Sequence, residues 1–98
     1  MAYQVEISER AERNLDAIVK YLAENWSEQV KTDFLADLAQ RFELIARMPR
    51  MYRQSRVWKG VYECVVNKYT IAYYRIRKDV VQIIPIQDSR QDPNTLEL

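Results

Sequence analysis

The 98-residue chain contains no histidine, one glycine and one cysteine, and each shortage excludes a class of chemistry. Without histidine there is no Ser-His-Asp or Cys-His nucleophile, no His-ligated metal and no side chain that ordinarily titrates near neutral pH. One glycine cannot supply a Gly-rich phosphate loop, which needs several. A single cysteine permits neither an internal disulfide nor a Cys-rich zinc site. Acid–base catalysis would therefore depend on a carboxylate, lysine, tyrosine or arginine with a shifted pKa.

The sequence also lacks long apolar runs. No stretch approaches the roughly 20 apolar residues of a membrane span, and the charged segment 1–13 does not have the pattern of a signal peptide. Hydrophobic residues make up 48% and charged residues 30% of the chain, as in globular proteins. The length predicts a single domain covering residues 1–98. We expect a cytoplasmic protein with no membrane partner, no cofactor and no metal.

The net charge of +1 hides an uneven distribution of charge along the chain. Residues 1–48 hold six basic and nine acidic side chains, whereas residues 49–98 hold nine basic and five acidic ones. Within 49–78, eight basic residues accompany a single acidic one, Glu63. This asymmetry indicates either a polyanionic or acidic partner for the second half, or a solvated sheet face with cations guarding its edges.

The first half of the chain predicts a strand and two helices. Residues 3–7 alternate in polarity, as in a half-buried strand. Two helical stripes follow, the first with Ser8 as N-cap and the second with Ser27 as N-cap. We expect Asn25 to end the first helix in a left-handed conformation and Pro49 to stop the second near residue 47 or 48. The stripes are Ala11, Leu15, Ile18 and Leu22, then Val30, Phe34, Leu38, Phe42 and Ile45.

The second half predicts a loop over 51–59 and then three strands, 61–66, 69–77 and 80–86. The turns 67–68 and 78–79 are short enough for hairpins, which gives an antiparallel meander. The run 80–86 is apolar on both faces, so we place it centrally, paired with 3–7, with a bulge or exit at Pro85. The fold class is therefore α+β: an N-terminal strand, a helical hairpin, then a three-stranded antiparallel meander.

Five segments of this α+β chain resemble the RelE/ParE superfamily of bacterial toxins and cover nearly its whole length. In the closing segment Asp88 stands where the family commonly has histidine. The resemblance, closer to the ParE branch, implies the toxin of a type II toxin–antitoxin module, a plasmid-stabilisation system that inhibits growth. The segments are Ile7–Leu15, Trp26 at the turn between helices, Phe42–Pro49, the Tyr-Tyr-Arg-Ile run Tyr73–Ile76, and Ile86–Pro93.

The resemblance leaves two molecular targets open, because ParE-type members poison DNA gyrase and RelE-type members cut messenger RNA on the ribosome. By alignment, Glu63 and Val65 stand where the nuclease branch has two lysines, and Thr70 where it has arginine. Leu96 or a neighbour stands where that branch has tyrosine, and Arg90 matches. These departures favour a gyrase poison with no catalytic residues. A non-toxic interaction module derived from the family is a further alternative.

Candidate site residues follow from this interpretation. Under the nuclease alternative, a base must take the proton of the 2′-hydroxyl while cations steady the phosphate. The catalytic candidates would be Arg56, Lys59, Glu63, Arg75 and Arg90, with Tyr62 as another conceivable base. Under the preferred interpretation the target-binding candidates are Arg53, Arg56, Lys59, Arg75, Arg77 and Arg90.

The resemblance also implies a cognate antitoxin, whose flexible C-terminal segment wraps the toxin in a hetero-oligomer. Apolar residues outside the main helical stripes predict where it binds, by an amphipathic helix in a groove or a strand added to a sheet edge. The antitoxin-binding candidates are Val19, Leu35, Leu44 and Tyr74. The tyrosines of the meander, Tyr62, Tyr69, Tyr73 and Tyr74, fit either base stacking or strand packing. Cys64 is expected to be a small buried hydrophobe.

Overall fold

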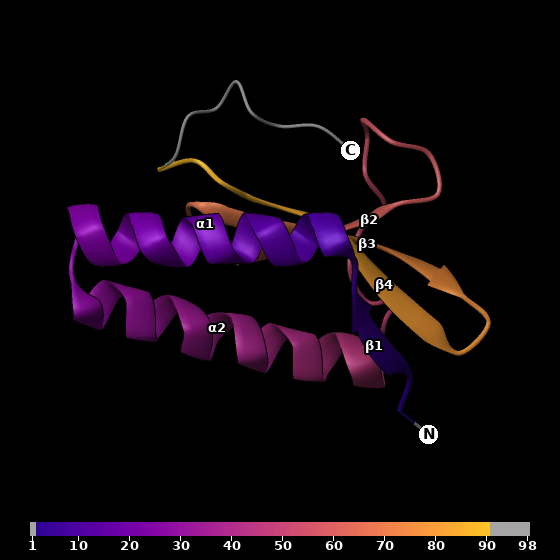
Figure 1. Cartoon of the computed structure of the whole chain (residues 1–98). Helices are drawn as coiled ribbons and strands as arrows, with labels where there is room; N and C mark the ends of the chain where they lie inside the picture. The colour runs from indigo at the N-terminus through magenta and orange to yellow at the C-terminus, as the bar shows by residue number, and fades with distance from the viewer. Residues whose placement is uncertain (1, 91–98) are drawn as a thin grey trace.

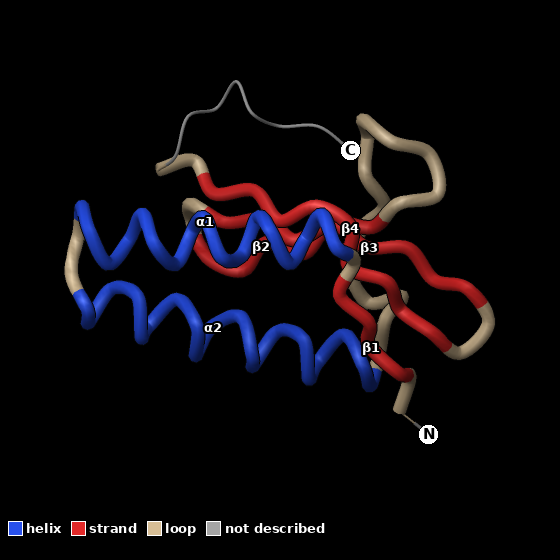
Figure 2. Tube along the Cα trace, viewed as in Figure 1, coloured by secondary structure: helices blue, strands red, loops and turns tan. Residues whose placement is uncertain are grey.

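A four-stranded sheet with two helices on one face makes up the described part of the chain, residues 2–90 of a computed structural model (Figure 1). The elements follow the order predicted from the sequence. They are β1 (Gln4–Ile7), α1 (Glu9–Asn25), α2 (Glu28–Arg47), β2 (Tyr62–Asn67), β3 (Thr70–Arg77) and β4 (Val80–Asp88). Figure 2 shows the two helices lying side by side against the strands.

Both helices begin at the predicted serine caps. The Ser8 hydroxyl accepts a hydrogen bond from the Ala11 amide, and the Ser27 hydroxyl accepts one from the Val30 amide, which satisfies amides that lack a helical partner. The prediction of a left-handed conformation at Asn25 is wrong, because Asn25 is the last residue of α1 and its φ is not positive. Its Nδ2 donates to the Tyr21 carbonyl at 3.1 Å. The helices are joined by Trp26 and Ser27 alone.

The strand order β1-β4-β3-β2 confirms that the last strand is central. β1 runs parallel to β4, while β3 pairs antiparallel with both β4 and β2. The register between β3 and β4 slips between Ala72 and Tyr74, where Ile84 and Pro85 stand opposite Tyr73, so Pro85 does lie in a bulge. A bulge suits proline because its nitrogen has no proton for the ladder.

The turns of the meander are set by local side chains. Lys78 and Asp79 form the second hairpin turn as predicted, with Lys78 at φ 56°. The first turn is one residue later than predicted, at Lys68 and Tyr69, because Asn67 pairs with Thr70. The Asn67 side-chain oxygen accepts hydrogen bonds from the Tyr69 and Thr70 amides, which closes this turn without glycine.

The core lies between the helices and one face of the sheet. On β3 that face carries Ala72 and Tyr74, which are fully buried. The fully buried side chains of Ile18 and Leu22 come from α1 and that of Ile45 from α2. Cys64, also fully buried, is a core residue as predicted, and burial raises the pKa of its thiol. Along β3 the alternate residues Tyr73, Arg75 and Arg77 therefore belong to the opposite, open face of the sheet.

Candidate functional site

The loop between α2 and β2, residues 48–61, joins α2 to the edge strand of the sheet (Figure 1) and carries the cations Arg50, Arg53, Arg56 and Lys59. The Trp58 ring meets the Tyr73 ring edge to face, with 4.9 Å between their centroids, which explains why Tyr73 is buried on an otherwise open face. The Ser55 hydroxyl accepts hydrogen bonds from the Val57 and Trp58 amides, both at 3.1 Å. These contacts connect the loop, which also carries the exposed Arg56 and Lys59, to the sheet at Tyr73.

Glu63, the one acidic residue of this basic region, is already paired. The Nε of Arg53 donates to its carboxylate at 2.6 Å, and the backbone amide of Glu63 donates to the Arg53 carbonyl at 3.0 Å. The Glu63 side chain is 11% exposed, whereas that of Arg53 is 68% exposed. Glu63 is therefore held in an ion pair with Arg53 rather than standing as an unpaired carboxylate.

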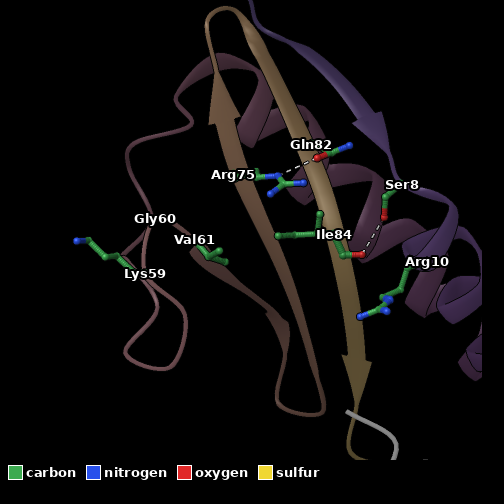
Figure 3. Close-up of a pocket in the computed structure, with 8 residues that line it drawn as sticks. All are labelled: Ser8, Arg10, Lys59, Gly60, Val61, Arg75, Gln82 and Ile84. Carbon is green, nitrogen blue, oxygen red and sulfur yellow. Dashed lines mark hydrogen bonds between the residues drawn. The ribbon is translucent and has the colours of Figure 1, made fainter. Parts of the chain in front are cut away.

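A hollow of about 370 Å³ opens on this face (Figure 3). Arg75, Gln82 and Ile84 of the sheet form part of its lining, and the Arg75 Nε donates to the Gln82 side-chain oxygen at 2.9 Å. One wall is the loop end at Lys59, whose ammonium points outward in Figure 3. The other wall is the start of α1. The lining residues are Ser8, Arg10, Lys59, Gly60, Val61, Arg75, Gln82 and Ile84.

Arg90 lies at the other end of the sheet, in a dense cluster of contacts. Its Nε and Nη2 donate to the two oxygens of Asp88 at 2.9 and 2.6 Å, and its guanidinium lies over the rings of Tyr69 and Trp26. The Thr70 hydroxyl donates to the same carboxylate at 2.7 Å. The side chains of Arg90 and Asp88 are 7% and 0% exposed, so this is a buried ion pair.

The cationic candidates therefore fall into separate places. Lys59 and Arg75 both line the hollow, next to Ser8 at the N-terminal end of α1. Arg90 instead contacts Trp26, at the C-terminal end of α1. An α-helix rises about 1.5 Å per residue, so the 17 residues of α1 separate the two places by roughly 25 Å. Arg77 is exposed at the end of β3. The five nuclease candidates do not converge on one phosphate.

The antitoxin candidates differ in how accessible they are. Leu35 is 39% exposed on α2, and Val19 and Leu44 are half-buried on the helical hairpin. The expectation for Tyr74 requires correction, because its side chain is fully buried and its hydroxyl donates to the Pro49 carbonyl at 2.6 Å. Burial raises the pKa of this hydroxyl. Tyr74 is a core residue with no surface to offer a partner.

Two residues that matter at these places were not found from the sequence. Arg10 belongs to a helical segment, and only the fold brings it beside Arg75. Asp88, which the sequence marks only as standing where the family commonly has histidine, is the ion-pair partner of Arg90 two residues later. Residues 91–93 of the closing segment lie outside the described residues, as does Leu96. Within residues 2–90 no three His, Cys, Asp or Glu side chains group as a metal site.

Comparison with known proteins defines the class to which this fold belongs. The structure resembles the chromosomal ParDE toxin–antitoxin system from P. aeruginosa with a TM-score of 0.76, at 15% identity over 89% of this chain and 96% of that one. It resembles the toxin–antitoxin complex RelBE2 from Mycobacterium tuberculosis with a TM-score of 0.63, at 18% identity over 90% and 99% of the two chains. The isolated E. coli RelE toxin gives a TM-score of 0.62, at 16% identity over 95% and 90%. The fold is that of the RelE/ParE-like toxins.

The family model for the ParE toxin of the type II toxin–antitoxin system parDE matches residues 5–93. The chain therefore belongs to the ParE toxin family, and the resemblance noted from its motifs is confirmed. Comparison with curated protein sequences gives no match. Within the described residues, neither helix is long and apolar enough to cross a membrane.

Proposed function

We propose that this chain is a toxin that poisons DNA gyrase and so inhibits replication in the cytoplasm. The observation that carries the proposal is that the cationic candidates do not converge on one place and that Glu63, the candidate base, is paired with Arg53. Lys59 and Arg75 lie at the open hollow, but Glu63 is bound by Arg53 at 2.6 Å. Arg90 is held by Asp88 at the far end of α1. Such a surface can bind an acidic target without supplying acid–base chemistry.

The target surface consists of cations on the open face and the neighbouring loop: Arg53, Arg56, Lys59, Arg75 and Arg77. These five cations outnumber Glu63, which stands opposite Tyr73 on the same face, and the resulting net positive charge favours association with an acidic surface. Arg90 belongs to the ion pair with Asp88, so its contribution to the target surface is indirect. It holds the end of β4 in place.

The proposal is tested by two parallel assays on the purified protein. One measures inhibition of gyrase supercoiling, and the other measures mRNA cleavage in a reconstituted translation reaction. We expect inhibition of supercoiling with no cleavage. Cleavage without a gyrase effect would replace the proposal by the ribosome-dependent nuclease, and absence of both effects would indicate a non-toxic interaction module.

We also propose that a cognate antitoxin neutralises the toxin by laying an amphipathic segment on the helical hairpin over Leu35. Leu44 lies nine residues further along α2, on the opposite side of the helix, so it belongs to a different surface. Leu35 supports this surface because 39% of a large apolar side chain is exposed there. Leu35→Glu should weaken the complex in a titration against the antitoxin, whereas Ala36→Glu, on the exposed side of α2, should not. Equal affinity of both variants, or of an antitoxin lacking its C-terminal segment, would contradict this surface.

A further inference from the structure

Among residues 2–90, the side chains that line the hollow beside the start of α1 include cations of three different elements and no carboxylate. Arg10 comes from α1, Lys59 from the loop and Arg75 from β3. The remaining lining residues are uncharged, and neither Glu6 nor Glu9 of the adjoining segment reaches the lining. A concave site lined by one sign of charge focuses its field and concentrates ions of the opposite sign. The hollow is therefore suited to an anion.

Arg10 offers a donor that the protein itself does not use. Its Nη1 is buried, yet it has no hydrogen-bond partner among residues 2–90. A buried donor without an acceptor is unfavourable, because it has given up its hydrogen bonds to water and gained none in return. In Figure 3 its guanidinium lies beside β4, below Ser8. Arg10 therefore brings to the wall of the hollow a guanidinium whose Nη1 has no partner among residues 2–90.

The side chain of Gln82 positions Arg75 without neutralising its charge. The single hydrogen bond from its Nε to Gln82, at 2.9 Å, orients the guanidinium, and Gln82 carries no charge that would cancel it (Figure 3). Neither terminal nitrogen of Arg75 has a hydrogen-bond partner within the described range. A guanidinium held in this way presents a preformed pair of donors to a phosphate or carboxylate.

The start of α1 and the open rim at Gly60 also favour the binding of an anion in the hollow. Ser8 caps α1, so the positive end of the helix dipole lies at the hollow, although Glu9 and Glu12 in the first turn reduce it. Gly60 has φ 77°, and no heavy atom lies within 4 Å of the place where a Cβ would stand. The rim is open at this point, and Val61 and Ile84 supply apolar surface within the hollow.

We propose that this hollow binds the phosphate group of a nucleotide unit, either a free nucleotide or a residue of a nucleic acid strand. Arg10 and Arg75 would hold the phosphate, and Lys59, whose long side chain stands at the rim, would reach it or the next phosphate. The volume of about 370 Å³ exceeds what one phosphate fills and falls within the usual range for small-ligand sites. The apolar residues Val61 and Ile84 would contact the sugar or base.

The test uses the full-length protein without gyrase or antitoxin, so its outcome is independent of the proposed function even though both use Lys59 and Arg75. Binding of a fluorescent 12-nucleotide single-stranded DNA is measured by anisotropy at several salt concentrations. Adenosine diphosphate, inorganic phosphate and a 12-residue poly-glutamate peptide are tested as competitors. Neutralising one or two phosphates predicts a slope of log K against log salt of about −0.7 to −1.4, and Arg75→Gln, Arg10→Gln or Lys59→Gln should each weaken binding at low salt and make the slope shallower.

Lys20→Gln is the matched control, because it removes one positive charge from the exposed side of α1 and should leave the slope unchanged. Circular dichroism checks that each variant folds. Amide chemical shifts of Ser8 and Gly60 locate the ligand in the unsubstituted protein, whatever the behaviour of the Arg10 variant. Competition by adenosine diphosphate identifies a free nucleotide, and competition by longer DNA alone identifies a strand.

Three results would overturn the inference. The first is no binding at low salt. The second is a loss with Lys20→Gln equal to that with Arg75→Gln, which would show general charge attraction. The third is displacement by poly-glutamate as readily as by DNA, which would make the ligand an acidic protein segment.

Discussion

The Arg90 guanidinium closes on the Asp88 carboxylate with two parallel hydrogen bonds, of 2.9 and 2.6 Å, and both side chains are buried. The Thr70 hydroxyl donates a further hydrogen bond to this carboxylate. The guanidinium lies over the rings of Tyr69 and Trp26. The pair thus joins the end of β4 to the β2–β3 turn and to the corner between the helices. Arg90, which aligns with a nuclease residue of the superfamily, has a structural role in this chain.

Arg90→Ala should destabilise the fold strongly, because it leaves the Asp88 charge buried without its partner. Breaking a buried ion pair from one side costs about 3–5 kcal/mol, and urea unfolding measures this loss. Arg77→Ala is the control, since Arg77 is exposed on the neighbouring strand and its removal should cost within about 0.5 kcal/mol. Equal stability of the two variants would contradict the structural role of Arg90. Loss of toxicity in Arg90→Ala alone therefore cannot demonstrate catalysis.

The same ion pair makes stability depend on acid pH. Burial by itself raises the pKa of Asp88, but hydrogen bonds from Arg90 and Thr70 outweigh burial and hold the pKa below its ordinary value. A carboxyl whose pKa is lower in the folded state stabilises the fold above its unfolded pKa, and this contribution is lost as pH falls through the folded pKa. Unfolding free energy should therefore fall as pH decreases below about 4.

Asp88→Asn isolates this contribution. It should be less stable than the unsubstituted protein at pH 6, and the difference should shrink towards pH 3, as measured by urea unfolding at each pH. Asp16→Asn, at an exposed position of α1, should follow the unsubstituted protein throughout. A constant difference between Asp88→Asn and the unsubstituted protein across this range would contradict the assignment.

Tyr74→Phe tests the correction that moves Tyr74 from a partner surface to the core. The substitution removes the hydroxyl that donates to the Pro49 carbonyl at 2.6 Å, so we expect a loss of about 1–3 kcal/mol in unfolding free energy. Antitoxin affinity should not change. Tyr62→Phe is the control: its ring stacks on Tyr74 at 5.4 Å, and its hydroxyl makes no hydrogen bond within the described residues. A change in affinity without loss of stability would restore Tyr74 to the partner surface.

The elements could be predicted from local pattern because their signals are local. The helical stripes, the serine caps and the two-sided apolar run of 80–86 each depend on residues close in sequence, and the structure confirms them. Pro85 is confirmed in a bulge. Its signal is also local, because the proline nitrogen has no proton to donate to the neighbouring strand. Even the shifted first turn has a local cause, the Asn67 side chain, which competes for the amides of Tyr69 and Thr70.

The candidate site was harder to predict because its contacts join distant segments. Periodicity puts Arg75 on the open face, but it does not say that Arg10, 65 residues earlier, lines the same hollow. The pairing of charges depends on the geometry of the loop. The sequence alone leaves Glu63 as a candidate base, whereas in the structure Arg53 binds its carboxylate. In the sequence, Asp88 and Arg90 are two polar residues near the end of the chain, and nothing in their spacing predicts burial. They form a buried pair because the Trp26 and Tyr69 rings pack on Arg90.

Arg75→Gln gives the most direct measurement of the central claim, which is that cations on the open face bind gyrase without cleaving RNA. The concentration of toxin that halves gyrase supercoiling is measured for this variant, for Lys20→Gln and for the unsubstituted protein. Losing a charge-assisted contact of about 1.5–3 kcal/mol predicts an increase of roughly tenfold or more for Arg75→Gln and no change for Lys20→Gln. Equal inhibition by all three proteins, or mRNA cleavage by the unsubstituted protein, would contradict the claim.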